Sequence, residues 1–383
     1  LPPNEQRSWM RLLAPDDAAD LVQIAPPPER DRLLSLLDEP TRREVKALLA
    51  YAEDAAGGLM NPRYARLRPD MTVDEAVSYL RKQARMQLET IYYLYVLDED
   101  KRLLGVLSLR QLFAGPEKPV RDLMETNVIS VRDDQDQETV SRLVAQHDLY
   151  AIPVVDSENR MKGIVTIDDV VDVVQEEATE DIQKFGGMEA LDMPYMKVAF
   201  ARLVRKRASW LAALFLGEML TATAMAYFED EIARAVVLAL FVPLIISSGG
   251  NSGSQASTLV IRAMALGEVK LRDWWRVIRR EFAAGVTLGI VLGSIGFLRI
   301  VLWQLVSPTY GPHYHLVAAT VFVSLVGVVT FGTVAGSLLP FVLRRVGFDP
   351  ASASAPFVAT LVDVTGLVIY FSSASLILGG TLL

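Results

Sequence analysis

The sequence predicts a multidomain membrane protein, in which an α/β soluble half and a short helical segment precede an all-α half of five membrane helices. Hydrophobic residues make up 51% of the 383 residues, and the long stretches without charge all lie beyond residue 207. Residues 1–181 instead carry 35 Asp and Glu against 22 Lys and Arg, a net charge of −13. Such an acidic half favours cations as partners and excludes nucleic acid, whose phosphates need clustered Lys and Arg.

Residues 1–53 predict a short helical domain, because leucine pairs alternate there with proline breaks and acidic residues. We interpret Asp16, Asp17 and Asp20 as helix caps rather than as part of a metal interface. The absence of cysteine from the sequence excludes disulfides, thiolate metal sites and cysteine nucleophiles. The chain begins Leu-Pro-Pro without a signal-peptide pattern, and the missing Met suggests that it starts inside a longer sequence.

An internal repeat occupies residues 61–175. LETIYYLYVLDEDKRLLGVLSLRQL (88–112) matches HDLYAIPVVDSENRMKGIVTIDDV (147–170), and each copy predicts strand, turn, strand and helix. A further helix precedes each copy, since TVDEAVSYLRKQA and DQETVSRLVAQH combine helical periodicity with acidic first turns. The repeat resembles a pair of cystathionine-β-synthase-type (CBS) domains, which we place at 54–119 and 120–175.

The CBS resemblance implies a nucleotide site in the second copy. In that family a Thr and an Asp three residues later often hold an adenosine ribose, and these two map onto Thr166 and Asp169. The first copy has Ser108 and Gln111 instead. ATP as a cofactor and a regulatory pair without nucleotide both stay open.

Carboxylates crowd the end of the repeat, where residues 168–181 contain Asp168, Asp169, Asp172, Glu176, Glu177, Glu180 and Asp181. If this segment is helical, four of them recur every four residues, and each such pair of like charges is destabilising by a few tenths of a kcal/mol unless cations neutralise it. A solvated helix face is the alternative. We favour a divalent-cation sensor, because residues 176–207 form an acidic linker that leads directly to the first membrane helix.

Five windows of about 20 or more residues lack breaks of charge, and they make residues 208–383 a transmembrane domain. The connections at 262–281 and 344–351 carry Arg and Lys, whereas those at 229–232 and 307–315 have neither. The positive-inside rule therefore places the soluble half in the cytoplasm and the C-terminus outside. We place the spans at 208–228, 233–261, 282–306, 316–343 and 352–379.

Charges inside the spans are candidate functional sites, since an acid at the bilayer centre costs roughly 3 kcal/mol on insertion scales. Asp363 is the only charged residue in 350–383, so it should face a wet cavity, a cation or a partner. Glu218 and Arg299 are charges well inside other spans, and we assign neither a role.

The second span contains Pro243 and then SSGGNSGSQAS (247–257), which is poor helix material. We expect irregular backbone there, buried in protein or lining a cavity. Small residues for close helix packing are the alternative.

The order of helical segment, CBS pair, acidic helix and five spans resembles the MgtE family of magnesium channels and transporters. The resemblance covers nearly the whole chain, although the helical N domain of that family is usually well over twice as long as residues 1–53. The stretches that carry it are AEDAAGGLMNP (52–62), EEATEDIQKFGG (176–187), SSGGNSGSQASTLVIRAMALGEVKLRDWWRV (247–277) and DPASASAPFVATLVDVTGLVIYF (349–371).

The MgtE resemblance implies a homodimer in a cell inner membrane, with a pore on the dimer axis lined by spans two and five. Asp363 would hold hydrated Mg²⁺ there, with the backbone carbonyl of Ala359 beside it. The pore-lining positions would be Gly249, Gly250, Asn251 and Gln255. Cytosolic Mg²⁺ would close the pore by bridging acids of the CBS pair and the linking (plug) helix, namely Asp136, Glu138, Asp148, Asp169, Asp172, Glu177, Glu180 and Asp181.

Three functions compete. The first is a magnesium-selective channel shut by internal Mg²⁺, and the second is an ion-coupled secondary transporter of divalent metals in which Asp363 takes up a proton. The third is a membrane-tethered nucleotide receptor, in which Asp363 is a structural acid bonded to Asn251 or Gln255. We do not expect an enzyme, because the three histidines form no catalytic set and no phosphate-binding glycine loop is present.

Overall fold

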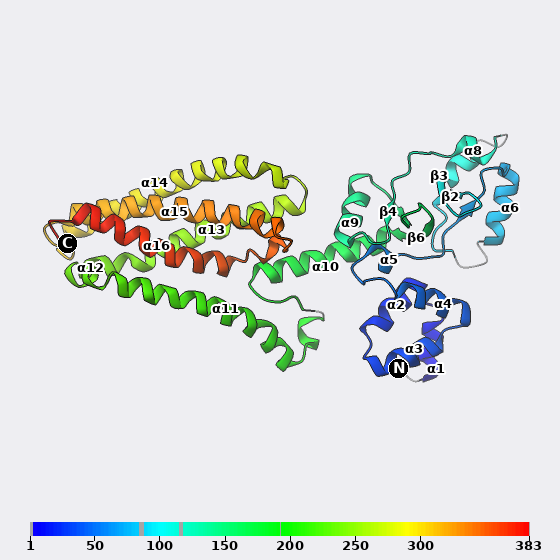
Figure 1. The fold of residues 1–383 in the computed structure, drawn as a ribbon, viewed down its shortest axis with the longest axis horizontal. Helices are drawn as coiled ribbons and strands as arrows, with labels where there is room; N and C mark the ends of the chain where they lie inside the picture. The colour runs from blue at the N-terminus through cyan, green and yellow to red at the C-terminus, as the bar shows by residue number, and fades with distance from the viewer. Residues whose placement is uncertain (1–2, 84–87, 115–117, 192, 383) are drawn as a thin grey trace. The chain divides into compact units, whose positions relative to one another are not determined.

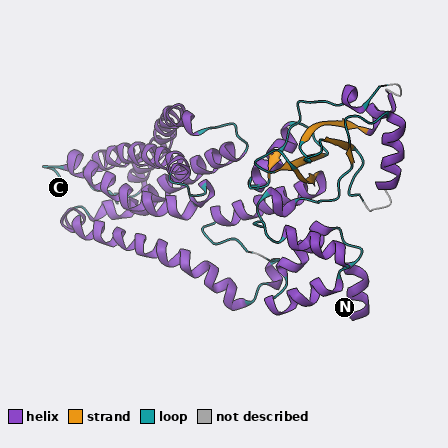
Figure 2. Ribbon diagram, turned by 45° about the vertical axis from the view of Figure 1, so that its right-hand side comes forward, coloured by secondary structure: helices purple, strands orange, loops and turns teal. Residues whose placement is uncertain are grey.

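The computed structural model describes residues 3–83, 88–114, 118–191 and 193–382 (Figure 1). The chain divides after Glu177 into two compact units, residues 1–177 and 178–383. The first unit combines helices with two small sheets, and the described part of the second unit is helical (Figure 2). The predicted fold class is confirmed.

Four short helices open the first unit. Proline stands at the first or second position of α2, α3 and α4, where the missing N–H costs no helical hydrogen bond. Their apolar faces, including Ala18, Val22 and Val45, form one buried cluster with Val154 and Val165 of the second CBS copy. The bounds are α1 (Pro3–Met10), α2 (Pro15–Ile24), α3 (Pro27–Leu36) and α4 (Glu39–Leu48).

Each CBS copy contains a three-stranded sheet, with orders β1-β2-β3 and β4-β5-β6. In both sheets the first pair of strands is parallel and the second antiparallel, and both have a register irregularity at equivalent places, Val96/Leu97 and Val154/Val155. The elements are α5 (Ala56–Leu59), β1 (Arg66–Leu67), α6 (Val73–Gln83), β2 (Tyr93–Leu97), β3 (Leu103–Ser108), α7 (Leu109–Ala114), α8 (Val120–Leu123), β4 (Val131–Arg132), α9 (Gln137–Gln146), β5 (Ala151–Val155) and β6 (Met161–Thr166).

The long helix α10 (Ile167–Phe185) leads from the first unit into the second. Among the described residues of that unit, five helical segments are long and apolar enough to cross a membrane, as predicted: 200–227, 236–265, 271–306, 314–345 and 355–378. The elements are η2 (Tyr195–Lys197), α11 (Phe200–Tyr227), α12 (Glu229–Arg234), η3 (Val236–Phe241), α13 (Val242–Ala265), η4 (Leu271–Asp273), α14 (Trp274–Val306), α15 (Tyr314–Arg345), η5 (Pro350–Ser352) and α16 (Ala355–Leu378).

The second span is a continuous helix, so the expectation of irregular backbone there was wrong. Helix α13 runs through the whole glycine- and serine-rich stretch, and its glycines lie directly against α15. A Cβ on Gly332 would collide with the carbonyl oxygen of Gly249, and one on Gly336 with that of Gly253. Close packing of small residues, the alternative interpretation, explains this stretch because backbones can approach only where side chains are absent.

Candidate functional site

Asp363 lies in the last span, on a face of α16 beside α13. One turn earlier, Ala359 lies against Gly250 of α13, and the neighbouring Val362 packs against Gly249. Because residues four apart share a helix face, Asp363 continues the line of Ala359. Its side chain is half-buried.

No cation meets the Asp363 carboxylate within the described chain. No Lys, Arg or His nitrogen of those residues lies within 4.0 Å of it. Its charged neighbour is instead another acid, since Glu218 of α11 lies close enough for the two carboxylates to repel. Helix α11 approaches α16 next to this pair, where Gly217 faces the methyl group of Thr360. The two intramembrane acids therefore share one region.

The four predicted pore-lining residues divide into two pairs on α13. Gly249 and Gly250 are buried against neighbouring helices, whereas Asn251 and Gln255 are exposed on a common face. The Asn251 amide donates to the Ser247 hydroxyl at 3.5 Å. Neither Asn251 nor Gln255 has a hydrogen bond to Asp363 among the described contacts, so the geometry of a structural acid bonded to either one is not present.

The acidic segment at 168–181 is helical, which was the condition for its acids to recur on one face. On α10, Asp172 is exposed and Asp181 half-buried, and Glu177 accepts a hydrogen bond from Gln137 Nε2 at 2.7 Å. Asp169 and Asp181 are twelve residues apart, which corresponds to about 18 Å of helix. One ion cannot contact both.

The acids predicted on the CBS copy itself are exposed. Asp136 caps α9, where its side chain accepts from the backbone N–H of Glu138 at 2.8 Å. Asp148 follows the same helix with a positive φ of 51°. Among the residues that the structure describes, no three of the His, Asp and Glu side chains are grouped closely enough to hold a metal ion. Within one described chain, the predicted sensor ligands are not a preformed metal site.

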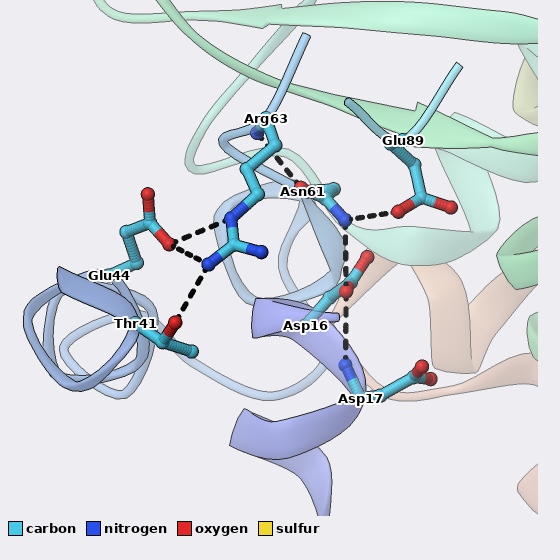
Figure 3. Close-up of polar contacts among 7 residues, drawn as sticks. All are labelled: Asp16, Asp17, Thr41, Glu44, Asn61, Arg63 and Glu89. Atoms are coloured by element: carbon cyan, nitrogen blue, oxygen red, sulfur yellow. Dashed lines mark hydrogen bonds and ion pairs between the residues drawn. The ribbon is translucent and has the colours of Figure 1, made fainter. Parts of the chain in front are cut away.

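A buried asparagine links the N-terminal helices to the CBS pair, and sequence reasoning missed it (Figure 3). Asn61 is 0% exposed, and its amide donates to Asp16 at 3.1 Å and to Glu89 at 2.7 Å. Its side-chain oxygen accepts from the backbone N–H of Arg63, whose guanidinium donates twice to Glu44 at 2.8 and 3.0 Å. The Met-Asn-Pro sequence marks this position, but only the fold brings its partners together.

Burial perturbs the acids around Asn61. Burial raises the pKa of Asp16 to about 7, and nearby Glu89 and Asp17 raise it further. Burial likewise raises the pKa of Asp169 to about 7, with Asp16 among the contributing charges. The interpretation of Asp16 as a helix cap was wrong, because the N-cap of α2 is Ala14.

A second group of N-terminal acids faces the acidic helix. Burial raises the pKa of Asp20 to about 6, and the charges of Glu53, Asp17 and Glu176 contribute. The pKa of Glu176 is raised by burial and then by Asp172 and Glu53. These acids raise one another's pKa because their negative charges repel. The N-terminal helices thus add carboxylates to the predicted sensor.

The side chains of Thr166 and Asp169 are hydrogen-bonded to each other. The Thr166 hydroxyl donates to Asp169 Oδ2 at 2.7 Å, and its backbone N–H donates to the same oxygen at 3.3 Å. In the first copy, Ser108 and Gln111 make the equivalent pair at 2.8 and 2.6 Å. Both pairs close the first turn of a helix, which is a structural role that needs no nucleotide.

The end of α10 packs against the membrane helices within the second unit. Phe185 contacts the buried cluster of Ile261, Ala351 and Ala353. Lys184 forms ion pairs with Glu180 and, at 2.6 Å, with Asp349 in the connection before α16. Burial alone would lower the pKa of Lys184, but hydrogen bonds to these two carboxylates outweigh it and raise the pKa. The predicted plug helix therefore has a fixed contact with the element that leads into the Asp363 helix.

Family models match the chain in four segments, and residues 177–241 lie outside all of them. Residues 1–54 match the MgtE intracellular N domain, and residues 56–115 and 120–176 each match the CBS domain. Residues 242–373 match the MgtE family model, described as a divalent cation transporter.

Similar proteins match over most of their length. The magnesium transporter MgtE of Thermus thermophilus is 46% identical over 95% of this chain and 79% of that protein. The magnesium transporter MgtE of Bacillus subtilis is 36% identical over 96% of this chain and 79% of that protein. A crystal structure of the cytosolic domain of the Mg²⁺ channel MgtE in complex with ATP is 50% identical, and covers 45% of this chain and 71% of that one with a TM-score of 0.44.

Proposed function

This chain belongs to the MgtE family of magnesium transporters, and on that premise we propose that it passes Mg²⁺ across a cell membrane along a path beside Asp363. The observation that carries the proposal is a carboxylate that has no cationic partner among the described residues and lies in the last of the five apolar helices that these residues form. Such a charge is unfavourable unless a cation or water meets it. The transported ion is that cation. The family is one of transporters, so the protein is not an enzyme.

Magnesium chemistry suits a single carboxylate that acts through water. Mg²⁺ demands octahedral oxygen ligands, sheds its waters reluctantly and is usually held by one or two carboxylates. In this proposal Asp363 binds the hydrated ion, and the Ala359 carbonyl lies beside it. The exposed amides of Asn251 and Gln255 supply polar groups on the adjacent helix.

A second carboxylate near the ion at Asp363 could come from either of two sources. A homodimer with a two-fold axis would double Asp363 at the axis and set both copies of α13 around the ion. Glu218, which lies near Asp363 in the same chain, would add a further negative charge. Together these carboxylates favour a divalent over a monovalent cation, because the electrostatic attraction that each one adds is proportional to the charge of the ion.

Gating follows from the acids of the first unit and of α10. Cytosolic Mg²⁺ that bridges these acids relieves their repulsion and stabilises the closed state, so high internal Mg²⁺ shuts off its own entry. The raised pKa values of Asp16, Asp20 and Asp169 are consistent with this proposal, because burial is their main cause and repulsion by neighbouring acids raises them further. The contact of Lys184 with Asp349 supports a route from α10 to α16.

We propose that the spans lie in the inner membrane of a cell, with the soluble half in the cytoplasm and the C-terminus outside. Basic residues support it, since Arg272, Arg276, Arg344 and Arg345 all flank the same ends of the spans. An adenine nucleotide at Thr166 and Asp169 has weaker support, because each of these side chains already satisfies the other.

The test is Mg²⁺ uptake into proteoliposomes that contain the full chain. Wild-type protein should take up Mg²⁺, with slower uptake when the soluble side holds millimolar-range Mg²⁺, and Asp363→Ala should reduce uptake to that of empty vesicles. Asp230→Asn, which removes an exposed acid at α12, is the matched control and should transport normally. Normal uptake by Asp363→Ala would refute the proposal and favour the nucleotide receptor.

The same vesicles discriminate a channel from a coupled transporter. A channel gives currents that follow the Mg²⁺ gradient and voltage with no movement of protons. Coupled exchange instead gives uptake that collapses when the proton gradient is removed. To test the gate, four acids of α10 are replaced together by Ala, namely Asp172, Glu177, Glu180 and Asp181. This variant should lose the protection that Mg²⁺ gives residues 182–195 against protease. Unchanged protection would exclude these residues as the sensor.

A further inference from the structure

Arg299 is the only Asp, Glu, Lys or Arg between residues 282 and 343, and no acid meets its charge. Among the residues that the structure describes, no carboxylate oxygen lies within 4.0 Å of it. Its Nη1 donates to the Tyr310 hydroxyl at 2.8 Å, and its guanidinium carbon lies 5.0 Å from the centre of the Trp303 ring. The cation is therefore held in place by two aromatic side chains, and no carboxylate of the described residues compensates its charge.

The contacts place the guanidinium near the surface of the membrane. Arg299 lies seven residues, or about 10 Å, before Val306 at the end of α14. Its partner Tyr310 belongs to the connection beyond that end, so the arginine side chain extends toward the surface. Trp and Tyr are the residues that prefer the headgroup level of a bilayer. Lipid phosphates occupy this same level.

An apolar groove runs along α14 next to the guanidinium. It has a volume of about 430 Å³ and is lined by Ile295, Leu298, Arg299, Leu302, Trp303 and Val306. Five of these six residues are apolar, and they recur at spacings of three and four residues, which places them on one face of the helix. The groove thus combines one cation with a strip of hydrocarbon, which matches the chemistry of an amphiphile that has an anionic head.

We propose that this groove binds a phospholipid, with the phosphate of an anionic headgroup on Arg299 and an acyl chain along Leu298, Leu302 and Ile295. Charge complementarity selects this occupant. A guanidinium carries five N–H donors in a fork that fits phosphate oxygens in pairs, and Tyr310 takes a hydrogen bond from only one nitrogen of the fork. A bound phosphate compensates the positive charge of Arg299, which has no carboxylate partner among the described residues.

A second copy of the chain is the competing occupant. Acids for Arg299 are available at the same ends of the spans, because Glu229, Asp230 and Glu231 begin α12 directly after α11. Such a contact would exclude lipid from the groove.

The experiment uses Trp303 as a local probe in the full chain. Trp9, Trp210, Trp274 and Trp275 are replaced by Phe, and the protein is reconstituted in phosphatidylcholine vesicles. Increasing fractions of either brominated phosphatidylglycerol or brominated phosphatidylcholine then quench the remaining tryptophan. We expect phosphatidylglycerol to quench at about fivefold lower mole fraction, the preference that one arginine near a membrane surface confers.

Arg299→Gln should abolish this fivefold preference. Arg299→Lys keeps the positive charge without the planar guanidinium and should retain part of the preference. The Lys variant also serves as a control in case the Gln variant misfolds. Arg345→Gln at the end of α15 removes an arginine remote from the probe in sequence and should leave the preference intact. Equal quenching by the two lipids in the parent protein would overturn the proposal, as would a full preference in Arg299→Gln. Failure of both lipids to quench would assign the groove to a second copy.

Discussion

The acids of the soluble unit and those of the membrane unit differ in how their charge is met. Asp16 and Asp169 are enclosed by protein, hydrogen-bonded to Asn61 and Thr166, and partly neutralised because burial raises the pKa of each to about 7. Asp363 has no such partner among the described residues, and its charged neighbour is Glu218. On the proposed function, we expect the soluble acids to affect the stability of their unit and its gating by Mg²⁺, and Asp363 to affect the transported ion directly. Substitutions should therefore change stability in one unit and flux in the other.

The largest expected effect is the pH dependence of the first unit. Asp16 is 7% exposed, and burial raises its pKa from 3.8 to about 7. The folded state then holds a proton that the unfolded state releases, so its contribution to stability is full below about pH 4 and is lost as the pH rises through 7. The loss by pH 8 is on the order of 4 kcal/mol.

Hydrogen exchange of the Ile164 amide, which donates to Asn61, measures this loss in the full chain without Mg²⁺. Asp16→Asn should reduce the slope of the profile between pH 5 and 8 and leave the part due to Asp20 and Asp169, whose pKa values are also raised. Asp70→Asn, which changes an exposed acid in the same unit, should leave the slope unchanged. A slope in Asp16→Asn equal to that of the wild type would show that Asp16 does not contribute to the pH dependence.

Removal of the buried amide should be the next largest effect. Asn61→Leu leaves the buried Asp16 and the half-buried Glu89 without their donor, and an unsatisfied buried group costs about 1–3 kcal/mol. We expect about 3 kcal/mol lower stability of the first unit by hydrogen exchange, with Mg²⁺ flux at low internal Mg²⁺ unchanged. Asn127→Leu, at an exposed position, is the control. If Asn61→Leu lowered flux and spared stability, the proposed division between the units would be wrong.

Glu218→Gln tests the membrane side of the comparison. If Glu218 supports the ion site at Asp363, its loss should reduce Mg²⁺ flux about tenfold at limiting Mg²⁺, the effect typical of a residue beside a metal ligand. Stability in detergent should not fall, because a charge is removed from an apolar region. Glu229→Gln at the start of α12 provides the matched control. Wild-type flux in Glu218→Gln would restrict the site to Asp363.

The smallest expected effect concerns Lys184. The ion pairs to Glu180 and Asp349 are partly exposed, so after allowance for solvent screening their loss in Lys184→Met should weaken docking of α10 by about 1 kcal/mol. Faster protease cleavage of residues 186–191 without Mg²⁺ would reveal the change. Lys46→Met, on the exposed surface of α4, should cleave at the wild-type rate. Equal rates in both variants would show that Phe185 packing alone holds the helix.

Periodicity predicted the five spans and the repeated strand-and-helix units, because apolar patterns report which faces are buried. The same reasoning failed for residues 247–257, where glycine and serine suggested broken helix. Their contacts with Gly332 and Gly336 stabilise the helix instead, and such contacts depend on a residue some 80 positions away. Tertiary packing outweighed local propensity.

The polar network around Asn61 could not be predicted from the sequence for a related reason. Asp16, Asn61 and Glu89 are separated by dozens of residues, and each type occurs commonly on protein surfaces. Asp363 was found because a single charge in an apolar stretch is conspicuous by itself. Its neighbour Glu218 could be placed beside it only once α11 was seen to pack against α16.

The glycines between α13 and α15 restrict how any gate in the second unit could move. Gly249 and Gly253 are one helical turn apart, as are Gly332 and Gly336, and backbone touches backbone at both levels. A sliding motion of less than a turn would bring a larger side chain, such as Val328, into one of these contacts. Helices α13 and α15 should therefore move as one rigid block. Helix α16 packs against the same glycines through Val358 and Val362, which leaves α11, the helix of Glu218, as the span least held by this block.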